Sequence, residues 1–307
     1  MIIKARVLFI NHKACIVLII KLLRMMVMNH KTGYFEGREN RKLFYQNWLP
    51  EGDVRACIVA MHDWGTHSDR FKYIAQYLTE KGYAIYTFDL RGHRRNIGEF
   101  PGHMDDMDHI QKDIVLFLDV IKKSLGKKKI FLIGHSFGGL ISLIFAINHP
   151  ALPGVIVSSP QLGLLKTSSI GKKLSKKFSG SLSKLAPTKN IEWVVDQNQL
   201  TGDLKILREH IADKEKTELI SVKSASEMNN SMKWAMKNAV NLLCPVLIMQ
   251  AGNDKIVDKA KTTDFFSKIK SEDKTYKEYD GFLHELWNER GRAQVYQDMF
   301  IWLEKHL

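Results

Sequence analysis

The sequence predicts an α/β fold in which a mostly parallel sheet is flanked by helices on both faces. From residues 43–48 onward, short apolar runs typical of buried strands alternate with longer segments of helical periodicity. One such run, 130–133, leads through a glycine-bounded turn into a second apolar run, as expected of a buried strand followed by a helix. The chain has 307 residues, 45% of them hydrophobic, and can therefore bury a large core.

The expected elements follow from hydrophobic periodicity and from the turn residues at their ends. The expected strands are 57–62, 84–90, 129–133, 154–158, 245–250 and 275–279. The expected helices include 106–125, with acidic residues in its first turn and one apolar stripe, 140–147, which stops before a His-Pro pair, and 293–303.

Three regions are expected. Residues 1–29 form an N-terminal extension, 30–160 and 240–307 form the core, and 161–239 form a helical cap inserted after the sixth strand. The cap is predicted because a connection of more than 80 residues without a core-type strand pattern is too long for a loop. The extension is apolar and basic, but its longest uncharged run, 14–20, is far shorter than the roughly 20 residues of a spanning helix. We expect it to be unfolded or spurious, with a weak membrane-surface anchor as the alternative.

The formal net charge of +13 favours anionic partners. Seven lysines and no acidic residue lie within 166–189, together with Ile170, Leu174 and Phe178 at helical spacing. This pattern predicts a basic amphipathic helix suited to peripheral contact with an anionic membrane; a solvated helix docked on the core by its apolar stripe is the alternative. Few aromatic residues interleave with the lysines, so we expect no nucleic-acid partner.

The cysteines indicate a reducing compartment. Cys15, Cys57 and Cys244 are odd in number and lack the spacing of metal ligands, and two of them fall in or beside expected strands. We therefore expect a cytoplasmic protein, either free or peripheral at the membrane.

The strongest chemical signal is a possible nucleophile. Residues 134–138 match Gly-x-Ser-x-Gly with Ser136 at the centre, and the match stands between an expected strand and an expected helix. A tight turn there would strain the backbone and expose the serine oxygen at the carboxyl edge of the sheet. An incidental serine in a glycine-rich turn is the alternative.

A serine nucleophile needs a base and a group that orients the base. With the order serine, acid, histidine, Asp254 follows an apolar strand and is the expected acid, with Asp258 as the alternative. Of the downstream histidines, His210 falls in the expected cap and His306 is the penultimate residue. His284 lies in the loop between the last strand and the last helix, and is the expected base.

The oxyanion of an acyl-transfer intermediate needs two N–H donors. The expected donors are the backbone N–H groups of Phe137, directly after the serine, and of Trp64, in the loop after strand 57–62. We expect His62 and His67 to serve loop packing and not metal binding, because no third ligand accompanies them at suitable spacing.

On these motifs the chain resembles the monoacylglycerol lipase and lysophospholipase branch of the α/β-hydrolase superfamily, a branch of serine aminopeptidase-like hydrolases. The matching segments are 62–71, 89–93, 134–139, 250–258 and 281–285. The resemblance implies an α/β-hydrolase fold, no cofactor, and a cap with a lipophilic acyl tunnel. It implies Ser136 as nucleophile, Asp254 as acid, His284 as base, and Trp64 with Phe137 as oxyanion donors.

The chain departs from the family pattern at two places. Asp63 stands where the family usually carries glycine, and this changes the charge of the oxyanion loop. Residues 94–96, Arg-Arg-Asn, replace the small residues usual after the Gly92-His93 pair.

Together these features predict a serine carboxylester hydrolase that cleaves single-chain acyl esters, such as monoacylglycerol or lysophospholipid, through an acyl-enzyme on Ser136. A hydrolase of small soluble esters or amides with the same triad is the alternative. A non-catalytic protein that docks on membranes is a third interpretation.

Overall fold

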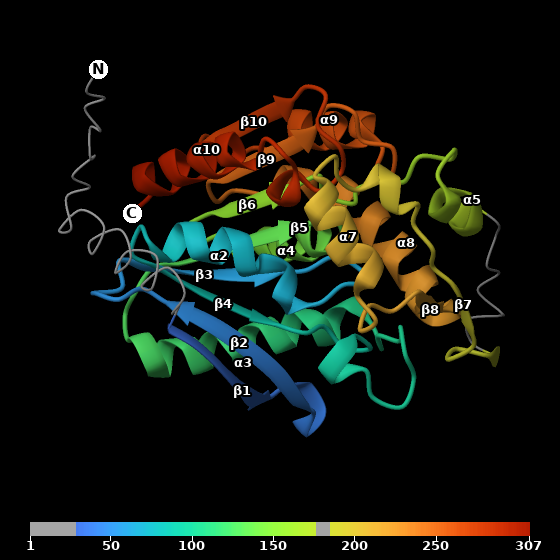
Figure 1. Ribbon diagram of the computed structural model, residues 1–307, viewed down its shortest axis with the longest axis horizontal. Coiled ribbons are helices and arrows are strands. Elements are labelled where there is room, and N and C mark those ends of the chain that lie inside the picture. The colour runs from blue at the N-terminus through green and yellow to red at the C-terminus, as the bar shows by residue number, and fades with distance from the viewer. Residues whose placement is uncertain (1–28, 176–184) are drawn as a thin grey trace, which may run out of the picture.

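The computed structural model describes residues 29–175 and 185–307, and its centre is an eight-stranded sheet of order β1-β2-β4-β3-β5-β6-β9-β10 (Figure 1). β1 and β2 pair antiparallel, as do β2 and β4, whereas the remaining neighbours are parallel. The strands are β1 (Asn29–Glu36), β2 (Lys42–Leu49), β3 (Ala56–Met61), β4 (Tyr83–Phe88), β5 (Ile130–His135), β6 (Val155–Ser158), β9 (Val246–Ala251) and β10 (Lys274–Tyr279). The predicted mostly parallel α/β fold is confirmed.

Helices cover both faces of this sheet. α2 (Lys72–Thr79) and α10 (Arg292–Lys305) contribute to the hydrophobic cluster on one face. α3 (Met107–Leu125), α4 (Phe137–Asn148) and α9 (Lys259–Lys268) contribute to the cluster on the other. Alternate residues of β3 belong to the two clusters: Val59 and Met61 to one, Ile58 and Ala60 to the other. A strand buried on both faces is apolar at every position, which explains the continuous apolar runs.

The predicted helix 106–125 is α3. The side chain of Asp106 accepts a hydrogen bond from the backbone N–H of His109 and caps the helix, which therefore begins at Met107. Gly126, with φ of 68°, follows its last residue. Most strand ends differ from prediction by one or two residues. β5 extends to His135, for example, because His135 still pairs with Ser158 of β6.

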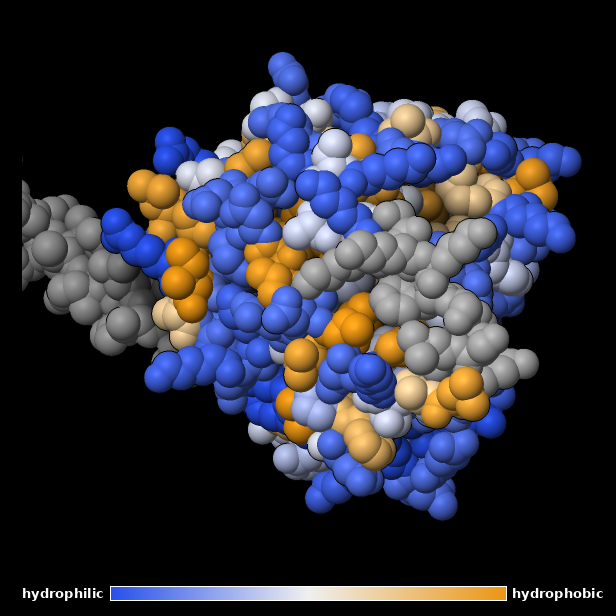
Figure 2. All heavy atoms as spheres, turned by 90° about the vertical axis from the view of Figure 1, so that its right-hand side faces the viewer, coloured by the Kyte–Doolittle hydropathy of each residue, from blue (hydrophilic) through white to orange (hydrophobic). Residues whose placement is uncertain are grey.

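The segment between β6 and β9 lies at the end of the molecule toward which the parallel strands point (Figure 1). Its elements are α5 (Ser169–Ser175), β7 (Asn190–Glu192), α7 (Leu204–Ala212), β8 (Leu219–Ser221) and α8 (Val222–Asn238). β7 and β8 form a small antiparallel sheet that the sequence pattern did not predict. Figure 2 faces this end, where apolar residues gather in patches among hydrophilic ones.

Two sequence predictions fall largely outside the described residues. The N-terminal extension 1–29 does so except for Asn29, the first residue of β1. The lysine-rich run 166–189 is described only at its two ends, so its contact with a membrane stays a proposal. No helix within residues 29–175 and 185–307 has the length and apolar character needed to cross a membrane.

A buried ion pair ties the loop after β4 to α3. The Arg91 guanidinium donates to both carboxylate oxygens of Asp113, with Nε at 2.6 Å from Oδ2 and Nη2 at 2.9 Å from Oδ1. Both side chains are about 1% exposed. The backbone N–H of Arg38 also donates to Oδ1, at 2.7 Å. Asp113 therefore holds two loops against the helix.

Replacing Asp113 by alanine leaves the Arg91 charge buried without its carboxylate. We expect Asp113→Ala to lower the free energy of unfolding by about 3–5 kcal/mol. Asp119→Ala is the matched control in the same helix, because Asp119 pairs with Lys122 at the surface; it should cost less than about 1 kcal/mol. Urea denaturation followed by circular dichroism measures both. Equal costs for the two variants would contradict this role of the buried pair.

Candidate active site

Ser136 lies at the sharp turn between β5 and α4. Its φ of 53° and ψ of −115° place a non-glycine residue in a sparsely populated region, which indicates backbone strain. A Cβ atom on Gly134 would overlap the carbonyl oxygen of Gly138, and one on Gly138 would overlap that of Met61. Both glycines of the motif are thus required because backbone passes against backbone.

Asp254 and His284 meet beyond the ends of β9 and β10. The Nδ1 atom of His284 donates to Oδ2 of Asp254 over 2.8 Å. The other oxygen, Oδ1, accepts the backbone N–H groups of Ile256 at 2.9 Å and Val257 at 3.0 Å. The loop after β9 therefore holds the carboxylate in place, and the carboxylate orients the imidazole.

The electrostatics of this pair favour an ionised acid beside a basic imidazole. Although burial acts in the opposite direction, the charge of His284 lowers the pKa of Asp254. Burial likewise opposes the charging of His284, but the carboxyl groups around it, Asp254 before Asp63 and Glu285, together raise the pKa of His284. His284 is 1% exposed, and its Nε2 atom makes no hydrogen bond with any described residue. That nitrogen is available to take a proton.

The other candidate acid and bases have different partners. Asp258 caps α9 by accepting the backbone N–H of Ala260 at 3.0 Å. His306 lies against Asp273, and His210 binds Glu285 at 2.5 Å. Of the residues named as alternatives, none lies beside both Ser136 and Asp254 among the described contacts.

The loop after β3 is held by histidines. The Nε2 atom of His62 accepts the backbone N–H of Leu90 at 2.9 Å, and its Nδ1 donates to the carbonyl oxygen of Asp63 at 2.8 Å. His67 binds Asp213 at 2.7 Å. Both side chains therefore connect loops, the packing role expected of them.

The two expected oxyanion donors converge on one point, and a side chain occupies it. The backbone N–H groups of Trp64 and Phe137 both donate to Oδ1 of Asp63, over 2.7 Å and 3.1 Å. The Ser136 hydroxyl lies near this carboxyl group and opposes the effect of burial, which raises the pKa of Asp63. No hydrogen bond joins Ser136 to His284 in the described part of the chain, although both lie beside Asp63. The departure from glycine at this position thus places a carboxyl group inside the expected oxyanion hole.

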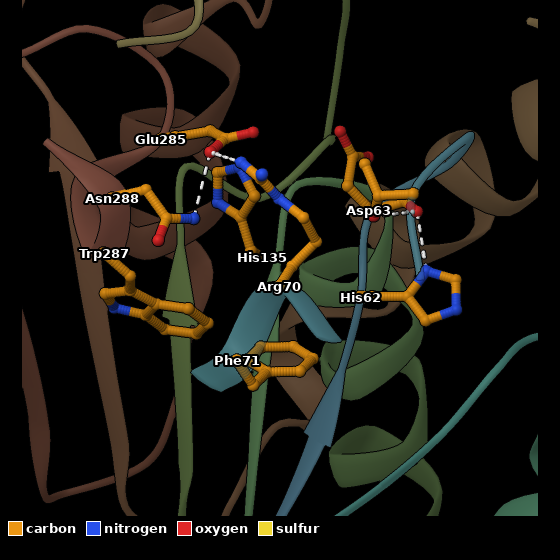
Figure 3. Close-up of a pocket in the computed structure, with 9 residues that line it drawn as sticks. His62, Asp63, Arg70, Phe71, His135, Glu285, Trp287 and Asn288 are labelled. Carbon is orange, nitrogen blue, oxygen red and sulfur yellow. Dashed lines mark hydrogen bonds and ion pairs between the residues drawn. The ribbon is translucent and has the colours of Figure 1, made fainter. Parts of the chain in front are cut away.

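A buried charge network lies beside Asp63 and was missed by the sequence analysis (Figure 3). Glu285 accepts from Arg70 at 2.5 Å and from Asn288 at 3.0 Å, and it binds His210 of α7 at 2.5 Å. A cavity of about 20 Å³, room for about one water molecule, separates this network from Asp63. The only sequence signal was that Glu285 directly follows His284.

The second departure, at residues 94–96, connects the core to the segment between β6 and β9. Arg94 forms ion pairs with Asp69 and with Glu215. Arg95 lies over the ring of Phe44, 4.1 Å from its centroid. Arg94 therefore joins the core to the segment between β6 and β9, whereas Arg95 packs within the core.

One group of side chains in the described ranges has the proximity that a metal ion needs. Potential ligand atoms of Asp63, His135 and His284 lie within 4.8 Å of one another. Asp63 already accepts two backbone N–H groups, and His284 is held by Asp254. These three side chains therefore have other partners among the described residues, and we assign no metal to them.

A mostly parallel sheet with a strained serine turn, and an aspartate–histidine pair on the two following strand ends, define an α/β-hydrolase. The chain belongs to the hydrolase family described as serine aminopeptidase, S33, whose pattern matches residues 52–291.

Relatives and solved structures agree with this family. Phospholipase YtpA of Bacillus subtilis is 29% identical over 259 residues, which are 81% of this chain and 95% of that protein. Monoacylglycerol lipase of Mycolicibacterium smegmatis is 24% identical and covers 89% of this chain and 96% of its own length. A soluble variant of monoglyceride lipase from Saccharomyces cerevisiae, solved with a substrate analogue, has a TM-score of 0.80 and 25% identity, covering 89% of this chain and 94% of that one.

Glu285 should contribute stability that depends on pH. Burial acts in the opposite direction, but Arg70 and His210 hold the pKa of Glu285 well below its ordinary value. A carboxyl group whose pKa is depressed on folding stabilises the protein above its unfolded pKa, and that stability is lost as pH falls through the folded pKa. We expect Glu285→Gln to lower the free energy of unfolding at neutral pH by about 3–5 kcal/mol.

The same variant should flatten the acid side of the stability curve, measured by urea denaturation at several pH values. Glu278→Gln is the control, because Glu278 pairs with Lys259 at the surface and should change stability by less than about 1 kcal/mol. A variant at position 285 that lost stability equally at every pH would show that the charge of Glu285 is not the cause.

Proposed function

We propose that this chain is a serine carboxylester hydrolase of the lipase and esterase type, acting on single-chain acyl esters such as monoacylglycerol or lysophospholipid. The observation that carries the proposal is the hydrogen bond of 2.8 Å between Asp254 and His284, formed beside the strained Ser136 turn. In this arrangement Asp254 orients the base, and the strained backbone turn directs the serine hydroxyl toward that base.

The proposed mechanism assigns each residue one role. Ser136 Oγ attacks the ester carbonyl carbon while Nε2 of His284 takes the hydroxyl proton, and Asp254 stabilises the imidazolium that forms. His284 then returns the proton to the leaving alcohol, and an acyl-enzyme remains on Ser136. Water, activated by the same imidazole, releases the acid. Because Ser136 and His284 are only 2% and 1% exposed, the segment between β6 and β9 must move to admit an ester.

Two observations support a lipophilic substrate. The relatives named above are lipases and a phospholipase. In addition, the segment between β6 and β9 exposes large apolar side chains at Leu185, Val194, Leu204 and Ile211. Trp193 of this segment meets Trp64 of the oxyanion loop, with ring centroids 6.3 Å apart. An exposed apolar surface on this segment suits an acyl chain, and the acyl tunnel expected in the cap is part of this proposal.

Removing the Ser136 hydroxyl should abolish turnover. We expect Ser136→Ala to lower kcat by a factor on the order of 10⁶ without changing the thermal unfolding midpoint by more than a few degrees. A p-nitrophenyl ester assay and labelling with a fluorophosphonate probe measure the effect. Retained hydrolysis in the variant would refute the assignment of Ser136, and an unlabelled wild-type protein would favour the non-catalytic, membrane-docking interpretation.

The acyl-chain preference distinguishes a lipase from a hydrolase of small soluble esters. Each methylene buried in an apolar site contributes about 0.8 kcal/mol, so kcat/KM should rise severalfold per added methylene until the site is filled. We therefore expect p-nitrophenyl decanoate to be cleaved faster than the butyrate, and the butyrate faster than the acetate. Steady-state kinetics over this series measure the trend. A preference for acetate would favour small soluble esters or amides as substrates.

A further inference from the structure

Asp63 lies where a hydrolase of this fold must bind its oxyanion. Donors of an oxyanion hole stand about 2.7–3.1 Å from the position that the oxyanion will occupy. The N–H groups of Trp64 and Phe137 stand 2.7 Å and 3.1 Å from Oδ1 of Asp63. One carboxyl oxygen therefore takes both backbone donors, and a substrate carbonyl oxygen cannot use them while it stays there.

An ionised Asp63 would oppose the reaction. A negative charge would face the oxygen on which negative charge develops, in a site shielded from water where such repulsion is strong. A neutral carboxyl group has the opposite effect. One of its oxygens can still accept the two N–H groups, while its O–H donates a hydrogen bond to the substrate.

Several titratable or charged groups face Asp63 from the neighbouring elements. Among these described groups, one can exchange a proton with Asp63. From its own loop comes His62, and from the end of β5 comes His135; burial lowers the pKa of each to about 3, so both are neutral. The charge of Arg70, across the small cavity, is paired with Glu285.

The remaining neighbour is His284. Burial has the dominant effect on Asp63 and raises its pKa, whereas the charge of His284 lowers it. The hydroxyl of Ser136, the reacting group itself, also opposes the effect of burial on the pKa of Asp63. Asp63 thus lies beside both the nucleophile and the base.

We propose that Asp63 is a further catalytic residue, which in its neutral form donates a hydrogen bond to the oxyanion in place of the two backbone N–H groups that it occupies. The proposal rests on the serine hydrolase function proposed above. It requires no group beyond those present, since Asp63 keeps its proton throughout. Ser136 Oγ forms the bond to the carbonyl carbon, its proton passes to His284, and the π electrons of the carbonyl move to the oxygen that Asp63 contacts. When the intermediate collapses, the carbonyl re-forms and the leaving oxygen takes the proton from His284.

The pH profile provides the distinguishing measurement. The active form has a proton on Asp63 and none on His284, so one proton is held by the pair. A second proton charges His284 and stops catalysis at low pH, and loss of the proton from Asp63 stops it at high pH. We therefore expect a bell-shaped profile of kcat/KM, with a basic limb that falls tenfold per pH unit. A conventional triad reaches a plateau at high pH.

Asp63→Asn tests the donor directly. The amide can accept the same two N–H groups and still donate to the oxyanion, but it cannot ionise. We expect its kcat/KM to stay within about tenfold of wild type near the optimum and to reach a plateau at high pH. Asp280→Asn is the matched control, because Asp280 lies exposed in the turn after β10. This variant should keep the bell-shaped pH profile of the wild type.

Asp63→Gly removes the carboxyl group that occupies the site and frees the two backbone N–H groups for the oxyanion. We expect this variant also to lose the basic limb of the pH profile, with a kcat no higher than that of wild type. Thermal unfolding of each variant checks that it is folded. If the asparagine variant does not fold, the pH profile of the glycine variant tests whether the basic limb depends on Asp63.

Two results would overturn the proposal. Identical pH profiles for wild type and both variants would show that catalysis needs no proton on Asp63. A glycine variant faster than wild type would show that the carboxyl group only obstructs the hole. Both results are distinguishable from failure of the proposed function, which Ser136→Ala tests on its own. If Ser136→Ala is inactive and the Asp63 variants keep the wild-type pH profile, only the role of Asp63 is rejected.

Discussion

The close approach of backbone to backbone at the start of α4 is the constraint on which the site depends. Gly138 lies against the carbonyl oxygen of Met61, the last residue of β3, and no larger residue fits there. This contact brings the N–H group that begins α4 beside the loop that follows β3. The strained turn at Ser136 and the convergence of the Trp64 and Phe137 N–H groups both follow from it.

Buried ion pairs hold further loops around the site. Arg91 and Asp113 fix the turn after β4 against α3, while Glu285 joins Arg70 of the core to His210 of α7. Each pair connects segments that are distant in sequence and are not joined by the sheet. Because a buried charge without its partner is costly, these pairs specify loop positions that apolar packing alone would leave free.

Periodicity predicted the elements whose signal is local. The strands β3, β4, β5, β6, β9 and β10 and the helix α3 were predicted with ends correct to one or two residues. Most of these strands are covered on both faces, and α3 has one apolar stripe, so their patterns are strong. β1 was not delimited, because most of its side chains are exposed. The β7–β8 sheet was not predicted, since strands of three residues carry too little pattern.

The sequence by itself determined the fold class, the turn that carries Ser136, and the order in which Asp254 and His284 follow it at strand ends, because these depend on local patterning and on the topology of parallel sheets. The tertiary structure decided where the Asp63 carboxyl group goes. Its bond to the N–H group of Phe137 spans 74 residues. A hydrogen bond of that range depends on how two loops pack, which neither periodicity nor residue type records.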